Sequence, residues 1–426
     1  MLRRIRDVES PLSAREALVV CLAILFVVVG GAGIRLAYPP DAEVAPTWSI
    51  GGDFVQFYIA GRILNDHQEG RLYDLSLQED RFKELVPGET WLRLPFNYPP
   101  FIAVLFRPLA RLPLLAATLV FLIVTPVVFA ASVWLLVSRF GWPAEGHWSL
   151  GVSGALSFAP FILYTWLGAQ ISVIGFCSLA VALCEEDRGR PFLGGMALSI
   201  CFYKPTLLLL VLPMLLITRR FRFLAGLAMG GAVLALISAL VAGPEGCLGF
   251  VERMRWWSRT STFDSGLFNP LRYVDLKSFV RLLPLGQYFA PSLILAFATG
   301  IPGTLLLRAW YRFRGEKRDE RLLLWAATLT WGLVLNVYTP FYDCILLVAP
   351  CILAASAARS AFGGLRYRGL GMMMVLLYFA PWGSEICARA FRVQPYTLVL
   401  AVFGALLLLL VNDLQRGAHA PAWRSA

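Results

Sequence analysis

The sequence predicts an all-α polytopic membrane protein, and three observations support this prediction. Of its 426 residues, 58% are hydrophobic and only 15% are charged, whereas soluble domains carry about 25% charged residues. The mean hydropathy is +0.66. Apolar runs long enough to cross the hydrocarbon core recur along the chain. A soluble enzyme, a disordered chain and a secreted disulfide scaffold are therefore excluded.

The apolar runs predict about twelve membrane helices. They lie at about 17–38, 113–138, 149–167, 171–184, 191–203, 204–218, 221–243, 288–310, 321–338, 341–357, 369–384 and 395–412. The first run is too long and too uninterrupted for a cleaved signal peptide, so we expect it to be retained as an anchor. A single membrane domain over 1–412 follows, with a polar tail over 413–426.

The basic residues orient these helices. A net charge of +11 would suggest nucleic acid in a soluble protein, but in a membrane protein it reflects Lys- and Arg-rich cytoplasmic loops, so no nucleic-acid partner is expected. With Arg3, Arg4 and Arg6 in the cytoplasm, the basic run over 308–321 is also cytoplasmic. Both termini are then expected in the cytoplasm.

The segment 191–218 is the ambiguous point, because it could form one kinked helix or a hairpin of two short ones. One helix would place the basic 308–321 run outside, so the hairpin is preferred. Arms of about 13 residues reach only about 20 Å. The tip at Tyr203-Lys204-Pro205 would then lie below the membrane surface, where irregular backbone requires surrounding protein or a wet cavity.

The first outside loop, 39–112, is expected to contain two short helices. Apolar residues at helical spacing after Asp53 predict a helix over 54–66 that lies on the membrane surface. Asp74 is placed to cap a second helix over 75–86. The following Pro95-Phe96-Asn97-Tyr98-Pro99-Pro100 predicts a rigid extended turn.

The second outside loop, 244–287, carries interleaved cations and indoles in the run Arg253-Met254-Arg255-Trp256-Trp257-Ser258-Arg259. Two interpretations stay open. Trp belts and Arg side chains that reach toward the surface are common at membrane interfaces. Alternatively, Trp rings stack on sugar faces while Arg binds phosphate through two parallel hydrogen bonds, which would make the run a sugar-phosphate site.

Four polar residues stand out at the outside end of the predicted helices: Asp53, Gln170, Lys204 and Asp343. Each has a structural alternative. Asp53 and Asp343 could cap helices, Lys204 could extend to the surface, and Gln170 could be a plain turn residue. Ionisable groups at membrane depth are costly and usually functional. Because all four are expected on the same side and at the same depth, a functional role is favoured.

The same landmarks resemble glycosyltransferase family 87. The resemblance rests on Asp53 followed by Ala60-Gly61, then Leu72-Tyr73-Asp74, Phe96-Asn97-Tyr98-Pro99-Pro100, Gly168-Ala169-Gln170-Ile171-Ser172 (with one residue more than the family pattern), Lys204-Pro205 and Thr339-Pro340-Phe341-Tyr342-Asp343. It implies the C-type glycosyltransferase (GT-C) fold, a donor sugar linked to polyprenyl phosphate, and an acidic general base in the first outside loop, which is Asp53 here. The family includes mycobacterial phosphatidylinositol-mannoside mannosyltransferases, which suggests a bacterial inner membrane and mannose as the hexose.

The expected chemistry is inverting transfer of a hexose to a lipid or glycan acceptor on the extracytoplasmic face. A base must remove the acceptor proton, and cations must hold the departing phosphate. The candidates for the phosphate are Lys204, Arg253, Arg255 and Arg259, and those for the sugar or acceptor are Tyr58, Tyr98, Gln170, Trp256, Trp257 and Asp343. Eight cysteines and three histidines form no ligand pattern, so neither a metal nor a cofactor is expected.

Two other functions fit the same architecture. A secondary transporter also needs many spans and buried polar residues, but such proteins usually show two related halves, and no internal repeat is visible here. A flippase or ligase for lipid-linked glycans shares the architecture and differs only in what it does with its substrate.

Overall fold

The described part of the chain is helical throughout. The computed structural model describes residues 14–37, 52–86, 95–141, 148–260, 270–283, 291–313, 315, 317–361 and 364–417. These residues contain no β-strand, only an isolated antiparallel bridge between Tyr273 and Pro340. The all-α prediction is therefore confirmed for the described residues.

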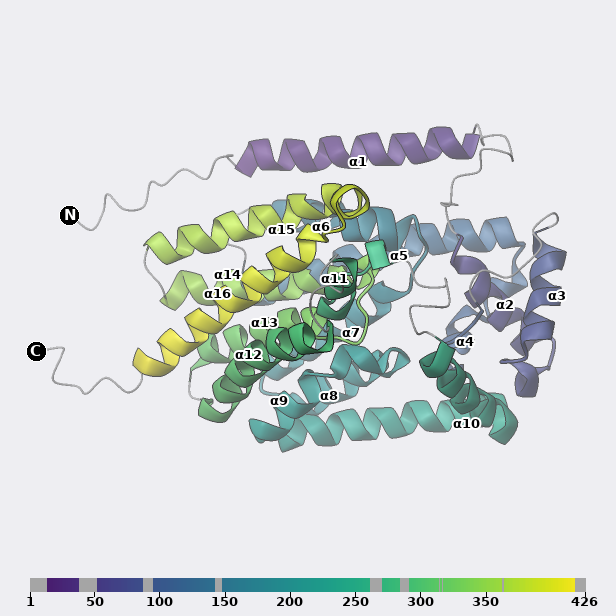
Figure 1. Ribbon diagram of the computed structural model, residues 1–426. Helices are drawn as coiled ribbons and strands as arrows, with labels where there is room; N and C mark the ends of the chain where they lie inside the picture. The colour runs from purple at the N-terminus through teal and green to yellow at the C-terminus, as the bar shows by residue number, and fades with distance from the viewer. Residues whose placement is uncertain are drawn as a thin grey trace, which may run out of the picture.

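Most of the helices run along the long direction of a bundle (Figure 1). These are α1 (Ala14–Ala37), α5 (Leu114–Phe140), α6 (Trp148–Leu156), α7 (Ser172–Asp187), α8 (Pro191–Leu198), α9 (Val211–Ile217), α10 (Phe221–Thr260), α12 (Pro291–Arg312), α13 (Arg318–Val334), α14 (Val348–Ala361), α15 (Gly364–Phe391) and α16 (Pro395–Gly417). Tighter or wider turns extend or join several of them: η5 (Pro160–Trp166), η6 (Ser199–Tyr203), η7 (Pro205–Leu208), η9 (Pro270–Arg272) and η11 (Phe341–Leu347).

Seven helices of the described chain are long and apolar enough to cross a membrane, and an eighth span results if α6 and η5, bent by 50°, count as one. The protein is thus a multi-pass membrane protein by the length and composition of its helices. The helices α7, α8 and α9 are shorter than a full span. The total of about twelve spans therefore stays a prediction, although a helical segment is present at each expected position.

Residues 191–218 form the hairpin that the sequence favoured. Gly195 on α8 lies against the backbone of Phe223, at the start of α10, and Gly230 further along α10 lies against Ser199. The segment over α8 and η6 therefore runs parallel to the first half of α10, so the chain must reverse between them. It does so at Lys204, whose backbone is not helical (φ −139°, ψ 81°). The tip consequently lies at the end of the bundle where the outside loops are expected.

The first outside loop forms a small unit at that end of the bundle, at the right of Figure 1. It contains α2 (Phe54–Asn65), η3 (Glu69–Arg71), α3 (Leu75–Leu85), α4 (Pro100–Phe106) and η4 (Leu109–Arg111). The rings of Phe57 and Phe106 stack at 4.8 Å between centroids in its core. As predicted, Asp74 caps α3 by accepting from the backbone N–H groups of Ser76 and Leu77. The helix α2 differs from the expected one-faced amphipathic helix, because nine of its residues are buried in this unit.

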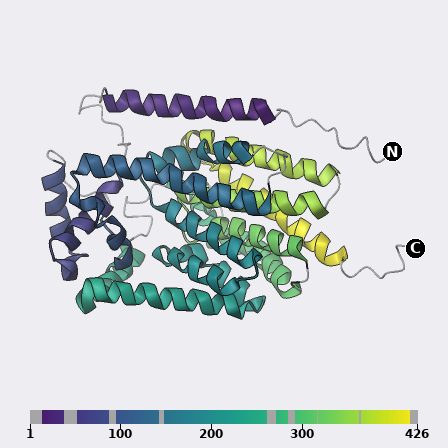
Figure 2. The ribbon, with the colours of Figure 1, turned by 180° about the vertical axis from the view of Figure 1, so that it is seen from behind.

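The second outside loop begins later than predicted. The helix over 221–243 does not end there; the backbone breaks at Gly243 (φ 65°, ψ −178°) and then continues as helix to Thr260. Seen from behind, α10 lies along one edge of the bundle and α1 along the other (Figure 2). The Arg- and Trp-rich run is therefore helical. Of its described side chains, Arg253 is buried, whereas Arg255 and Trp256 are exposed. A short helix, α11 (Leu276–Leu282), follows and is capped by Asp275.

Close contact between α8 and α10 depends on glycine, as is common between membrane helices. A Cβ atom at Gly226 would lie 1.9 Å from the carbonyl oxygen of Phe192, whereas one at Gly303 on α12 would meet nothing within 4 Å.

We predict that Gly226→Ala lowers the stability of the purified protein by about 1–3 kcal/mol, as is usual for overpacking. Gly303→Ala, the matched control, should leave the melting temperature unchanged or slightly raised; equal effects of the two substitutions would contradict the proposed contact.

Candidate active site

Asp53 lies directly before α2, but its side chain does not cap the helix. Its backbone is already helical (φ −79°, ψ −12°) and no capping hydrogen bond is made. Instead, the carboxylate accepts a hydrogen bond from Nε2 of Gln170. Burial raises the pKa of Asp53 to about 6, against the lowering effects of this hydrogen bond and of the Arg272 charge. At neutral pH the group is mostly ionised and is a stronger base than an exposed aspartate.

Gln170 is fixed in the turn between η5 and α7. Its backbone N–H donates to the carbonyl of Thr165 at 2.8 Å, and Ala169 before it has a positive φ of 54°. The side chain is buried, and its Oε1 has no hydrogen-bond partner among the described residues. A buried polar atom without a partner costs about 1–3 kcal/mol. A ligand hydroxyl placed beside Asp53 would satisfy this oxygen.

A second carboxylate, Asp343, is held by two partners from distant parts of the chain. It lies in the first turn of η11, where it makes no cap. Its Oδ2 forms a buried ion pair with Lys204 at the hairpin tip, and its Oδ1 accepts a hydrogen bond of 2.9 Å from Ser172. Lys204 therefore does not extend to the surface; its charge is compensated within the protein.

Tyrosine rings lie around the Lys204–Asp343 pair. The ammonium of Lys204 lies 4.9 Å from the ring centroids of Tyr338 and of Tyr342. Tyr98, in the Pro-rich turn, stacks on Tyr203 with centroids 6.2 Å apart. Burial raises the pKa of Tyr98 well above its usual value, and the neighbouring Tyr338, Asp343, Asp53 and Tyr273 raise it further. The charges of Asp343 and Asp53 both act on the phenol of Tyr98, which therefore lies near both carboxylates.

Arg253 connects the end of α10 to the same region. Its Nε donates to Oδ1 of Asn97 at 2.6 Å, and Asn97 directly precedes Tyr98 in the chain. Its guanidinium lies 4.3 Å from the ring of Trp256, and the residue is buried. Among the described side chains of the Arg- and Trp-rich run, Arg253 is the one that is buried.

The other members of that run are less closely tied to the site. Arg255 and Trp256 are exposed. The side chains of Trp257 and Arg259 lie outside the described part of the structure. Tyr58 is also not brought to the two carboxylates: its hydroxyl donates to the carbonyl of Leu112 at 2.7 Å, and its ring is buried in the core of the first loop.

The structure adds residues that the sequence did not single out for a role. Ser172 and Tyr342 contact the Lys204–Asp343 pair directly. Arg272 acts on Asp53 and also donates to Glu385 at 3.4 Å. Ser172 lies two residues after Gln170, and Tyr342 directly precedes Asp343. Their closeness in sequence to predicted site residues could therefore have indicated them. Nothing in the sequence connects Arg272 to Asp53.

Among the described residues, no group of three or more His, Cys, Asp and Glu side chains is arranged to hold a metal ion. The expectation that transfer proceeds without a metal or cofactor stays a prediction.

Comparison with known proteins identifies related chains. The family model of "Glycosyltransferase family 87" matches residues 96–350, a range that includes Gln170, Lys204, Arg253 and Asp343 and that begins after Asp53. A curated relative from Mycobacterium tuberculosis (strain CDC 1551 / Oshkosh) is 25% identical over 386 residues, which cover 88% of this chain and 81% of the relative. It is described as a polyprenol-phosphate-mannose-dependent alpha-(1-2)-phosphatidylinositol pentamannoside mannosyltransferase. No solved structure matches significantly.

The Lys204–Asp343 pair yields a prediction about stability. Asp343→Leu leaves the ammonium of Lys204 buried without its counter-charge, so we expect a loss of about 3–5 kcal/mol. The double variant Lys204→Met/Asp343→Leu should recover most of that loss, because neither charge is then unpaired. Thermal unfolding in detergent measures both.

Glu84→Leu provides the control for this experiment. Its carboxylate forms an ion pair with Arg81 but is half exposed, so its removal should change the melting temperature little. A single variant Asp343→Leu as stable as the wild-type protein would contradict the proposed role of the pair.

Proposed function

The chain belongs to glycosyltransferase family 87, and on this basis we propose that it transfers a hexose from a polyprenyl-phosphate donor to a lipid or glycan acceptor. One observation carries the proposal: the Asp53 carboxylate makes no capping hydrogen bond and is instead held by Gln170, near Tyr98. The dependence of the mycobacterial relative on polyprenol-phosphate-mannose supports a lipid-linked donor and makes mannose the first sugar to test.

In the proposed reaction, Asp53 removes the proton from the acceptor hydroxyl while the oxygen of that hydroxyl bonds to the anomeric carbon of the donor sugar. The bond between that carbon and the phosphate oxygen breaks, and the polyprenyl phosphate leaves with the electron pair. A carboxylate with a pKa of about 6 is suited to this task, because it is ionised at neutral pH and yet retains basicity. Attack opposite the leaving phosphate inverts the anomeric configuration.

The departing phosphate needs cations that are already in place. Arg253 is buried at the end of α10 and fixed by Asn97, which supports it as one ligand. Lys204 is a second candidate, although its ammonium is already bound to Asp343, so a phosphate would share it with that carboxylate. Arg255 and Arg259 continue the same helix and complete the proposed set.

The sugar and the acceptor are proposed to lie between the two carboxylates. Tyr98 lies within reach of both, and Gln170 offers a buried oxygen without a partner that can accept from a hydroxyl. Asp343 is held rigid by Ser172 and Lys204, which suits a group that orients a sugar. Trp256 and Trp257 are proposed to meet the donor at the edge of the site.

The proposed place of the reaction is the extracytoplasmic face of a bacterial inner membrane. The site lies at one end of the bundle, whereas the first residues of α1 and the last residues of α16 lie at the other (Figure 1). The second end carries Arg219, Arg220 and Arg222 together with Arg312 and Arg318, and the positive-inside rule assigns such an end to the cytoplasm. Family membership favours transfer over the alternative of transport.

One prediction of the proposed function concerns the general base, Asp53. Asp53→Asn removes the proton acceptor while keeping the shape of the side chain, so we expect turnover to fall by about 10²–10⁴-fold or more. Binding of a labelled polyprenyl-phosphate mannose should remain near the wild-type affinity. A donor screen with the purified protein measures both.

Asp74→Asn is the matched control. Asp74 lies in the same loop but caps α3, and asparagine caps almost equally well, so activity should be retained. Wild-type turnover by Asp53→Asn would remove Asp53 from the mechanism.

The pH dependence provides an independent prediction. Protonated Asp53 cannot accept the acceptor proton, so kcat/KM should fall as the pH decreases through about 6, the pKa raised by burial, and should level off above it. Gln170→Leu removes a hydrogen bond that lowers this pKa, so the inflection should move to higher pH. A pH profile that is flat between about 5 and 8 would show that a group with this pKa does not limit the reaction.

A further inference from the structure

A basic pocket lies at the end of the bundle opposite Asp53. It has a volume of about 860 Å³ and is formed between the end of α9, the end of α12 and the end of α16. Four arginines line it: Arg219, Arg308, Arg312 and Arg416. We call these residues and the cavity between them the arginine pocket. No step of the proposed transfer uses it.

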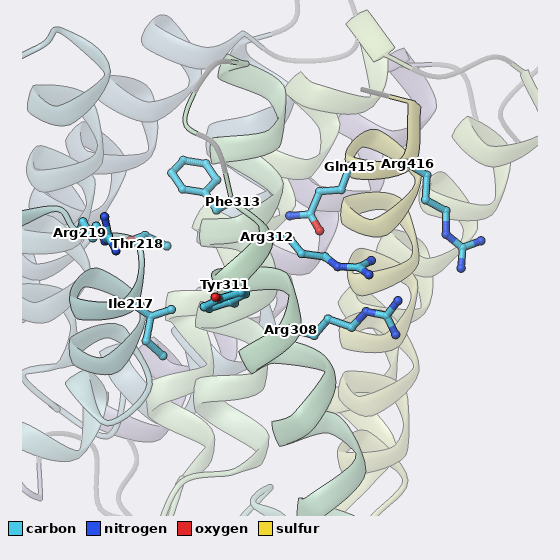
Figure 3. Close-up of a pocket in the computed structure, with 9 residues that line it drawn as sticks. All are labelled: Ile217, Thr218, Arg219, Arg308, Tyr311, Arg312, Phe313, Gln415 and Arg416. Atoms are coloured by element: carbon cyan, nitrogen blue, oxygen red, sulfur yellow. The ribbon is translucent and has the colours of Figure 1, made fainter. Parts of the chain in front are cut away.

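The arginines lie at or just beyond the ends of three helices, α9, α12 and α16. Figure 3 shows Arg308 and Arg312 extending from α12 toward α16, where Arg416 lies. Arg219 lies on the other flank of α12, at the end of α9 (Figure 3). Gln415 fixes the wall, because its Nε2 donates to the carbonyl of Ala309 at 3.0 Å and to Glu320 at 2.9 Å.

The charges of this pocket have no counter-charge bound to them among the described residues. Other arginines at the same end are paired within the protein: Arg220 with Glu186 at 2.8 Å and Arg318 with Asp187 at 2.9 Å. For the four pocket arginines, no ion pair is found in the described part of the chain. Arg308 and Arg312 stand four residues apart on one helix, where like charges repel. An anion in the cavity would remove this repulsion.

The chemistry of the lining selects phosphate. Guanidinium groups bind phosphate oxygens through paired, charge-assisted hydrogen bonds. Three or four of them around one cavity suit a headgroup that carries a net negative charge. Tyr311, directly before Arg312 on α12, adds an exposed aromatic ring to the lining, as is typical of residues at headgroup level.

The surroundings select a lipid over a free anion. The arginine pocket lies at the ends of two candidate membrane spans, Ile294–Arg312 and Pro395–Arg416. On the turns that lead away from it into the membrane, apolar side chains are exposed: Ile301 and Leu305 on α12 and Leu409 on α16. A headgroup among the arginines would therefore place its acyl chains along surfaces that already face lipid, and basic pockets between membrane helices recognise anionic lipids in this way.

We propose that the arginine pocket binds the phosphate headgroup of an anionic phospholipid and thereby ties α12 to α16. The proposal does not depend on the glycosyl transfer, and its test measures binding alone.

The test compares the affinity of the full-length protein in detergent for dioctanoyl phosphatidylglycerol and dioctanoyl phosphatidylcholine. The wild-type protein should bind the anionic lipid more tightly. In Arg308→Gln/Arg312→Gln, binding of phosphatidylglycerol should weaken by about tenfold or more, since each charge-assisted hydrogen bond contributes strongly. Phosphatidylcholine binding should not change.

Arg190→Gln/Arg222→Gln is the matched control, because it removes the same charge from the same end but outside the pocket. It should retain the wild-type affinity for phosphatidylglycerol. An equal loss in both double variants would mean that a diffuse basic surface binds the lipid, and an unchanged affinity in Arg308→Gln/Arg312→Gln would mean that the pocket does not. Either result overturns the proposal, as would displacement of the lipid by an equal concentration of inorganic phosphate.

A second variant keeps the test decisive if the double substitution impairs folding. Arg219 has a positive φ of 57°, a conformation that glycine adopts more readily than arginine. Arg219→Gly therefore removes one guanidinium without straining the backbone, and should weaken phosphatidylglycerol binding by about threefold or more. A stable Arg219→Gly protein with wild-type affinity, together with a double variant that binds normally, would overturn the proposal.

Discussion

The need to compensate buried charge organises the outside end of this protein. Lys204 and Asp343 lie 139 residues apart in the chain and form a buried pair, because either charge alone would cost several kcal/mol at this depth. Ser172 completes the arrangement from a third element. The pair thus fixes the hairpin tip against η11 and the start of α7. These are the elements that carry Gln170 and the tyrosines, so the geometry of the site follows from this one interaction.

The same constraint explains why Asp53 is a credible base. Its helix, α2, is buried on nearly all sides, and Asp53 itself is partly buried, so the carboxylate is poorly solvated; its side chain makes no capping hydrogen bond. One amide donor from Gln170 offsets only part of the cost of burial, and the pKa therefore remains raised, at about 6. A stronger partner such as a lysine would hold the charge more firmly but would also remove the basicity that proton abstraction requires.

The sequence predicted what depends on local composition. Hydropathy located the helical segments. The basic runs favoured the 191–218 hairpin, which the packing of Gly195 against Phe223 confirms. The cap at Asp74 could be predicted from the residues directly around it. The misjudged features depend on distant contacts. The hydropathy of 221–243 gave no sign that α10 resumes after Gly243. The burial of α2 depends on α4, and the partners of Asp53 and Lys204 lie more than 100 residues away, where spacing carries no information.

The two ends of the bundle differ in whether their charged side chains form ion pairs within the protein, and this difference supports separate roles. At the Asp53 end, the charges of Lys204 and Asp343 compensate each other inside the protein. At the other end, Asp187 compensates Arg139, Arg318 and Arg321, whereas the arginines of the pocket form no ion pair within the described part of the chain. Open cations at headgroup level are therefore best explained by a ligand that the membrane itself supplies.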